Sequence, residues 1–144
     1  MGPSEPGDWN MQTARKKRIL IADCYVEVLL ALERMLEDAG FDTTTAWTGR
    51  EALGLIQSQT FDLVLVSKYL PDTECEDILK TLQQTGASTP CIVMQPSTPE
   101  STELDALRAV GACDVVCKYA YYQIVGLVTD WLGWVKTAAA AQVA

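Results

Sequence analysis

Ser67 and Lys68 follow directly on a run of four apolar residues, where a hydroxyl and an ammonium group could carry out chemistry. The run, Leu63 to Val66, shows no alternation of polar and apolar residues, which is typical of a strand covered on both faces in a parallel sheet. In open parallel sheets, functional side chains gather where the strands end. A serine hydroxyl is a poor nucleophile at neutral pH without a base, and the chain has no histidine to act as one. We expect Lys68 to be an exposed loop residue.

The composition favours one globular domain with an acidic surface. At 144 residues, 49% of them apolar, the chain can bury a core without disulfides. The net charge of −8 disfavours binding to nucleic acid, and we interpret the basic run from Arg15 to Arg18 as a solvated lead-in. The sequence contains no signal peptide and no apolar segment of membrane length. We therefore expect a cytoplasmic protein that binds neither nucleic acid nor membrane.

Five cysteines occur, and no two of them form a CxxC pair. Their odd number, in a chain with a full-size core, indicates reduced thiols in a cytosolic protein. We interpret Cys91 and Cys117 as packing residues of strands. A disulfide between Cys24 and Cys75 is an alternative that we consider weaker than simple space-filling.

Apolar periodicity predicts strands that alternate with helices. Strands are predicted at residues 18–22, 42–46, 63–66, 91–94 and 114–118. Helices are predicted at residues 26–39, 49–58 and 74–84, from near Pro99 to a stop before Gly111, and at 121–136. This alternation predicts an α/β fold with three layers, a doubly wound parallel sheet of five strands between helices. The domain is expected over residues 18–136, between a flexible arm (1–17) and an alanine-rich tail (137–144).

Several motifs, in their order along the chain, resemble the receiver domain of bacterial two-component response regulators. A dinucleotide-binding domain would need glycines in "IADCYVEV", and a thioredoxin-like enzyme would need a CxxC pair. The resemblance covers residues 18–136 and rests on "ILIADC", "LEDAGF", "TGREAL", "FDLVLVSKYLPD", "TPCIVM" and "VGACDVVCK". It implies the flavodoxin-like strand order 2-1-3-4-5, with helices on both faces of the sheet.

The resemblance also implies a degenerate phosphorylation pocket. Receivers hold two acidic residues after strand one, a phosphoaccepting aspartate at the end of strand three, a serine or threonine after strand four and a lysine after strand five. The corresponding pocket residues here are Asp23, Cys24, Ser67, Tyr69, Gln95 and Lys118. Tyr119 replaces the proline after the lysine, Val115 stands at the aromatic switch position, and Cys75 replaces a loop glycine. We therefore expect a pseudo-receiver without enzymatic activity or cofactor, in which binding of Mg²⁺ is weak or lost.

Asp23 and Lys118 are expected to face each other in this pocket. They could form a residual ion site, or an ion pair that neutralises two buried charges, and we favour the ion pair.

The predicted function is phosphorylation-independent protein–protein signalling by a stand-alone receiver-like module. The partner would be another signalling protein or a second copy, bound through helix four, strand five and helix five. The predicted partner surface is formed by Val115, Tyr119, Tyr122 and Trp134. Two alternatives stay open: phosphorylation at Ser67 or at Asp72, which we expect to be exposed, and a small-molecule or redox module that uses the vacated pocket.

Overall fold

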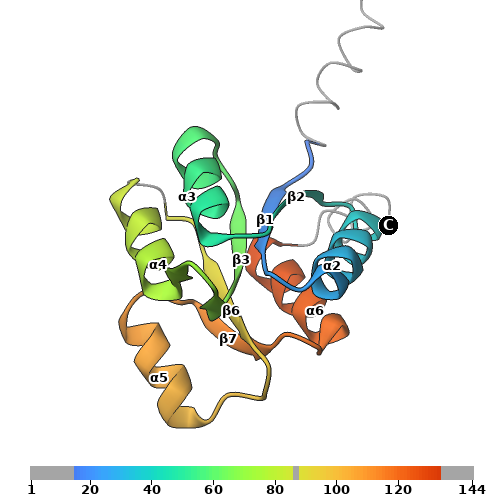
Figure 1. The fold of residues 1–144 in the computed structure, drawn as a ribbon. Helices are drawn as coiled ribbons and strands as arrows, with labels where there is room; N and C mark the ends of the chain where they lie inside the picture. The colour runs from blue at the N-terminus through green and yellow to red at the C-terminus, as the bar shows by residue number, and fades with distance from the viewer. Residues whose placement is uncertain (1–14, 86–87, 134–144) are drawn as a thin grey trace, which may run out of the picture.

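Five parallel strands form the central sheet of the protein (Figure 1). The computed structural model describes residues 15–85 and 88–133. The strands of this sheet are β1 (Arg18–Ala22), β2 (Asp42–Ala46), β3 (Leu63–Ser67), β6 (Cys91–Gln95) and β7 (Asp114–Cys117). Their spatial order, β2-β1-β3-β6-β7, is the 2-1-3-4-5 order predicted from the sequence, and every neighbouring pair is parallel.

Helices cover both faces of this sheet and make the structure three-layered (Figure 1). One face carries α2 (Val26–Asp38) and α6 (Tyr121–Leu132), and the other carries α3 (Gly49–Ser58), α4 (Cys75–Gln84) and α5 (Ser101–Ala109). None of the helices in the described part of the chain is long and apolar enough to cross a lipid bilayer.

The alternation of side chains along each strand divides the core into two apolar layers. In β1, Ile19 and Ile21 pack with α2 and α6, whereas Leu20 and Ala22 pack toward α3 and α4. Because both sets are apolar, the strand reads as a continuous apolar run in the sequence. Cys91 is buried in the layer with Leu20, as its predicted packing role requires.

The last helix is shorter than predicted. It ends at Leu132, because Gly133 adopts a φ of +68° that leaves the right-handed helical region. The prediction that the helix reaches Lys136 is therefore wrong. Trp131 of this helix is half exposed, while Ile124 and Val128 are buried. Trp134 lies outside the described residues.

A small antiparallel pair after β3 was not predicted. It consists of β4 (Tyr69–Leu70) and β5 (Thr73–Glu74), and its turn contacts the start of α3. The Asp72 carboxylate accepts hydrogen bonds from the backbone N–H groups of Gly49 (2.8 Å) and Arg50 (3.0 Å). A carboxylate is favourable there, because the first N–H groups of a helix have no partner within the helix. The loop after β3 is thereby fixed to α3.

Candidate functional site

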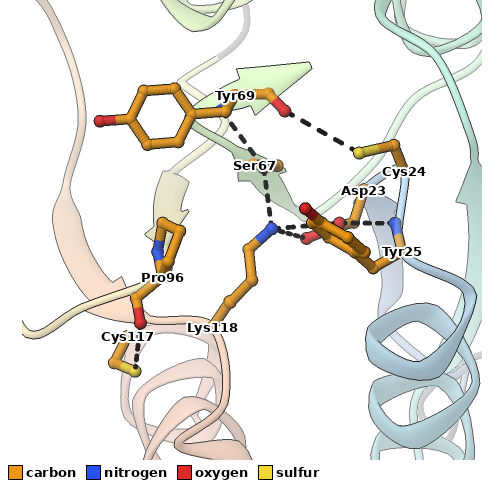
Figure 2. Close-up of polar contacts among 8 residues, drawn as sticks. All are labelled: Asp23, Cys24, Tyr25, Ser67, Tyr69, Pro96, Cys117 and Lys118. Atoms are coloured by element: carbon orange, nitrogen blue, oxygen red, sulfur yellow. Dashed lines mark hydrogen bonds and ion pairs between the residues drawn. The ribbon is translucent and has the colours of Figure 1, made fainter. Parts of the chain in front are cut away.

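Three polar side chains from the ends of three different strands meet at the carboxyl edge of the sheet (Figure 2). The Lys118 ammonium lies 3.0 Å from Oδ2 and 3.2 Å from Oδ1 of Asp23, and it donates to Ser67 Oγ at 3.3 Å. Asp23 and Ser67 are 0% exposed, and Lys118 is 1% exposed. The expected contact between Asp23 and Lys118 is therefore present, and Ser67 joins it.

The sheet holds these residues in place through their backbones. Ser67 is the last residue of β3, and Asp23 and Lys118 each follow a strand directly. The N–H of Asp23 donates to the carbonyl of Ala46 (3.1 Å), and the N–H of Lys118 donates to that of Gln95 (2.7 Å). Both hydrogen bonds extend the pairing of the strands by one residue. The sheet thus fixes the backbone positions from which the three polar side chains extend.

Tyr25 completes the surroundings of the ammonium, and sequence reasoning missed this residue. Its ring centroid lies 4.7 Å from Lys118 Nζ, within the range of a cation–π contact. Its backbone N–H donates to Asp23 Oδ1 at 2.9 Å, which fixes the start of α2 on the same carboxylate. The position two residues after a strand-ending aspartate was the available signal, since aspartate accepts from such an N–H in local turns.

The hydrogen bonds of this cluster are not all ideally oriented. Asp23 Oδ2 has no aligned hydrogen-bond donor although the ammonium lies 3.0 Å away. The ion pair, rather than a directed hydrogen bond, compensates the burial of this oxygen. Removing one partner of a buried ion pair costs roughly 3–5 kcal/mol, because the other charge stays buried without compensation.

Tyr69 and Cys24 border the site above Ser67. The N–H of Tyr69 donates to Ser67 Oγ at 3.3 Å, and the Cys24 thiol lies 4.0 Å from the carbonyl oxygen of Tyr69. In Figure 2 the backbone of Tyr69 faces Ser67, while its ring points away from the site. Two of the predicted pocket residues thus contribute one N–H group and one half-buried thiol at the border of the site.

Gln95 belongs to the same edge but turns its amide elsewhere. The side chain is buried, its Nε2 donates to the carbonyl of Ser97 at 3.2 Å, and its Oε1 has no hydrogen-bond partner. Its backbone carbonyl accepts from Lys118, so it supports the lysine through the main chain.

Lys68 is half-buried, so its prediction as an exposed loop residue is wrong. Its ammonium pairs with Glu103 at 3.8 Å and lies 5.5 Å from the ring centroid of Tyr69. The backbone N–H of Glu100 is the main cause that lowers the pKa of Glu103, and Lys68 contributes to the same shift. The two neighbours Ser67 and Lys68 therefore act separately, one in the buried site and one at the start of α5.

Asp72, Cys24 and Cys75 each have different hydrogen-bond partners. Asp72 is exposed, as predicted, and its hydrogen bonds from Arg50 and Gly49 lower its pKa. Cys75 is buried, and burial raises the pKa of its thiol to about 12. Cys24 and Cys75 are both free thiols. A protonated thiol is a poor nucleophile and a poor metal ligand.

Only part of the predicted partner surface is exposed to solvent. Val115 is 4% exposed and packs in the core between the sheet and α5, so its assignment to that surface is wrong. Valine points inward here because it alternates with Val116, which faces the opposite layer. Tyr119 and Tyr122 are exposed.

The donors at this site do not fit the Mg²⁺ ion that a receiver-type pocket implies. Mg²⁺ requires hard oxygen ligands, and the carboxylate that the site offers, Asp23, is already paired with an ammonium. Cys24 contributes sulfur, which is a soft ligand. Among the described residues, no group of three or more acidic, cysteine or histidine side chains is arranged to hold a metal ion.

The fold and this edge define a class of protein: a flavodoxin-like doubly wound domain with its polar site at the carboxyl ends of the strands. The family model of the response regulator receiver domain matches residues 19–124. This chain belongs to that family.

Curated relatives and solved structures agree with this assignment. The chain is 30% identical to the cell cycle transcriptional regulator CtrA of Caulobacter vibrioides, in an alignment that covers 70% of this chain and 43% of CtrA. It is 28% identical to the transcriptional regulatory protein ZraR of Salmonella typhimurium over 69% of its length and 22% of the relative. The chain thus spans less than half the length of these relatives.

The fold is similar to a CheY-like receiver domain protein from Methanospirillum hungatei, with a TM-score of 0.74 and 22% identity over 85% of this chain and 98% of that one. A receiver domain of a Luxo repressor protein from Vibrio parahaemolyticus gives a TM-score of 0.75 and 21% identity over 88% and 97% of the two chains.

Proposed function

We propose that this receiver domain is a pseudo-receiver, a non-enzymatic signalling module that binds another protein without being phosphorylated. The observation that carries this proposal is the buried contact of Lys118 with both Asp23 and Ser67. The partner is another signalling protein or a second copy of this chain. We also propose a cytoplasmic site of action, where the five free cysteines stay reduced.

Ser67 is poorly suited to accept a phosphoryl group. Its hydroxyl oxygen already accepts hydrogen bonds from Lys118 and from the N–H of Tyr69, and it is fully buried. Activation of a serine requires a neighbouring base, and the nearby carboxylate of Asp23 is paired with the ammonium. Both the nucleophile and its access to a donor are therefore unfavourable.

The ammonium supplies the positive charge beside Asp23 at this edge. Lys118 draws Asp23 and Ser67 together from strands β1 and β3 without any metal or phosphate. A domain fixed in this way has one resting arrangement, which suits constitutive binding better than switching. The alternative acceptor Asp72 is engaged by the first turn of α3, and no observation favours it.

The experiment that tests this proposal is exposure of the full chain to acetyl phosphate and Mg²⁺, followed by measurement of the intact mass. A receiver that keeps an aspartate at the end of its third strand serves as the positive control. We expect the mass of this protein to stay unchanged while the control gains a phosphate. A stoichiometric gain of one phosphate by this chain would refute the proposal.

A further inference from the structure

Half-exposed aromatic side chains follow four of the five strands of the sheet. Tyr25 follows β1, Trp47 follows β2, Tyr69 follows β3 and Tyr119 follows β7, and each is 51–58% exposed. Because the strands are parallel, all four positions lie at the carboxyl edge of the sheet. We call these four residues the aromatic edge. The four positions extend across the sheet from β2 at one end to β7 at the other. The fold gains nothing from leaving such large apolar side chains in water, which favours a role for them in binding.

Three of the four residues have their backbone fixed by a local hydrogen bond. The N–H of Tyr25 is held by Asp23, that of Tyr69 by Ser67 Oγ, and that of Trp47 by Glu51 Oε1 at 2.7 Å. The first two contacts belong to the buried cluster around Lys118 (Figure 2). Because the aromatic residues start from fixed backbone positions, binding to them requires little further ordering.

Carboxylates surround the aromatic edge. Helices α2, α3, α4 and α5 begin at this edge, and each has acidic residues in its first turn. Exposed examples are Glu27, Glu51, Asp72, Glu76 and Asp77. Acids at helix starts stabilise the helices by themselves, so they do not imply a partner without the aromatic residues.

The positive charges at this edge are mostly engaged within the protein. Lys118 is buried against Asp23, and Lys68 is paired with Glu103. Arg50 is the one exposed basic residue at this edge in the part of the chain that the structure describes. Lys118 and Lys68 also lie over the rings of Tyr25 and Tyr69. The edge therefore presents the remaining exposed area of these two rings, together with Trp47 and Tyr119, within a surface of net negative charge.

We propose that the aromatic edge is a docking surface for a basic, arginine-bearing segment of a partner protein. A guanidinium group stacks on an aromatic ring and at the same time pairs with a carboxylate, so it matches both features of this surface. Anionic partners such as nucleic acid are repelled by the same carboxylates. This inference rests on the proposed function, because it assigns the surface and the chemistry of the partner.

A second copy of this chain is a less suitable occupant than a different protein. The basic run from Arg15 to Arg18 is the available basic segment, but Arg18 donates to the carbonyl of Thr60 and to the side chain of Gln59. Lys16 lies 4.0 Å from the carboxylate of Asp42. Two of the four basic side chains thus already have partners in their own domain.

Nuclear magnetic resonance of the ¹⁵N-labelled full chain tests the proposal with short synthetic peptides. The probes are an arginine–glycine–serine peptide, its lysine counterpart and its glutamate counterpart. Trp47→Ala and Tyr69→Ala remove parts of the surface without changing its charge. Trp131→Ala is the matched control, because Trp131 is also half exposed but lies at the end of α6, near the opposite edge of the sheet.

We expect the arginine peptide to shift the backbone signals of Tyr25, Trp47 and Tyr69 and the indole signal of Trp47, and to bind more tightly than the lysine peptide. Trp47→Ala and Tyr69→Ala should each raise its Kd about tenfold or more, as is typical of aromatic interface anchors. Trp131→Ala should leave Kd unchanged.

Several results would overturn the assignment. The first is an unchanged Kd of the arginine peptide for the Trp47→Ala and Tyr69→Ala variants. The second is a glutamate peptide that binds as tightly as the arginine peptide. The third is a shift of the same signals with protein concentration alone, which would identify a second copy as the occupant. None of these results depends on whether the protein can be phosphorylated. The intact-mass experiment therefore tests the proposed function separately from the docking surface.

Discussion

The ammonium of Lys118 lies 3.0 Å from the carboxylate of Asp23, although β3 and β6 lie between the strands that carry them. The lysine follows β7 at the edge of the sheet, and its side chain crosses the ends of two strands to reach the end of β1. This contact ties the carboxyl ends of the strands together, with Ser67 and Tyr25 as further partners of the ammonium.

Lys118→Ala should strongly destabilise the protein. The substitution leaves the Asp23 carboxylate buried without a counter-charge, which costs roughly 3–5 kcal/mol of the free energy of unfolding. Chemical denaturation followed by circular dichroism measures this loss. Lys80→Ala, at an exposed position of α4, is the control and should change stability little. Equal stability of the two variants would contradict the structural role of the pair.

Asp72→Asn should reduce stability in a pH-dependent way. The N–H groups of Arg50 and Gly49 lower the pKa of Asp72 below its ordinary value of 3.8. The charged carboxylate therefore stabilises the folded state above pH 3.8, and this contribution is lost as the pH falls through the folded pKa. Unfolding curves from neutral to acidic pH should converge for the wild type and Asp72→Asn. Asp105→Asn, an exposed change in α5, is the control; a difference that persists unchanged at low pH would exclude this explanation.

Two glycines of α3 should respond to alanine in opposite directions. A Cβ at Gly49 would overlap the side chain of Thr73, whereas a Cβ at Gly54 meets nothing within 4 Å. Gly54→Ala should stabilise the protein by about 0.5–1 kcal/mol, the usual gain for this change in a helix. Gly49→Ala should destabilise it by about 1–3 kcal/mol, as overpacking does. Thermal unfolding of both variants gives the comparison, and stabilisation by Gly49→Ala would show that the contact with Thr73 is not tight.

The cysteines should differ in their reaction with a thiol reagent at mildly alkaline pH. Burial raises the pKa of Cys75 to about 12, that of Cys113 to about 11, and that of Cys91 well above its ordinary value. These three thiols stay protonated and should react slowly in the folded protein, because the thiolate is the reactive form. Mass spectrometry after brief alkylation measures the order in which the cysteines react. Rapid alkylation of Cys75, or a disulfide between Cys24 and Cys75 under oxidising conditions, would contradict this prediction.

The sequence predicted those parts of the structure that depend on local patterns. Buried strands such as β3 are visible in the sequence as apolar runs. The strand order and the contact of Asp23 with Lys118 followed from the resemblance to a family, because that resemblance specifies which strand ends meet.

What escaped prediction depends on contacts between residues far apart in the chain. The ion pair of Lys68 with Glu103 joins the loop after β3 to α5, and the hydrogen bond from α3 to Asp72 requires the turn between β4 and β5. Val115 was misassigned because the sequence does not reveal which face of an apolar edge strand is covered. Tyr69 and Tyr119 were named from the sequence, but their grouping with Tyr25 and Trp47 was missed, because only the parallel pairing of the strands places all four at the same edge of the sheet.

The most direct test of the central claim, that the pocket beside Asp23 does not bind Mg²⁺, is a Mg²⁺ titration of the ¹⁵N-labelled protein. The backbone signals of Asp23, Cys24, Ser67 and Lys118 should stay unchanged throughout the physiological range of Mg²⁺. Saturable shifts of these signals at such concentrations would contradict the claim.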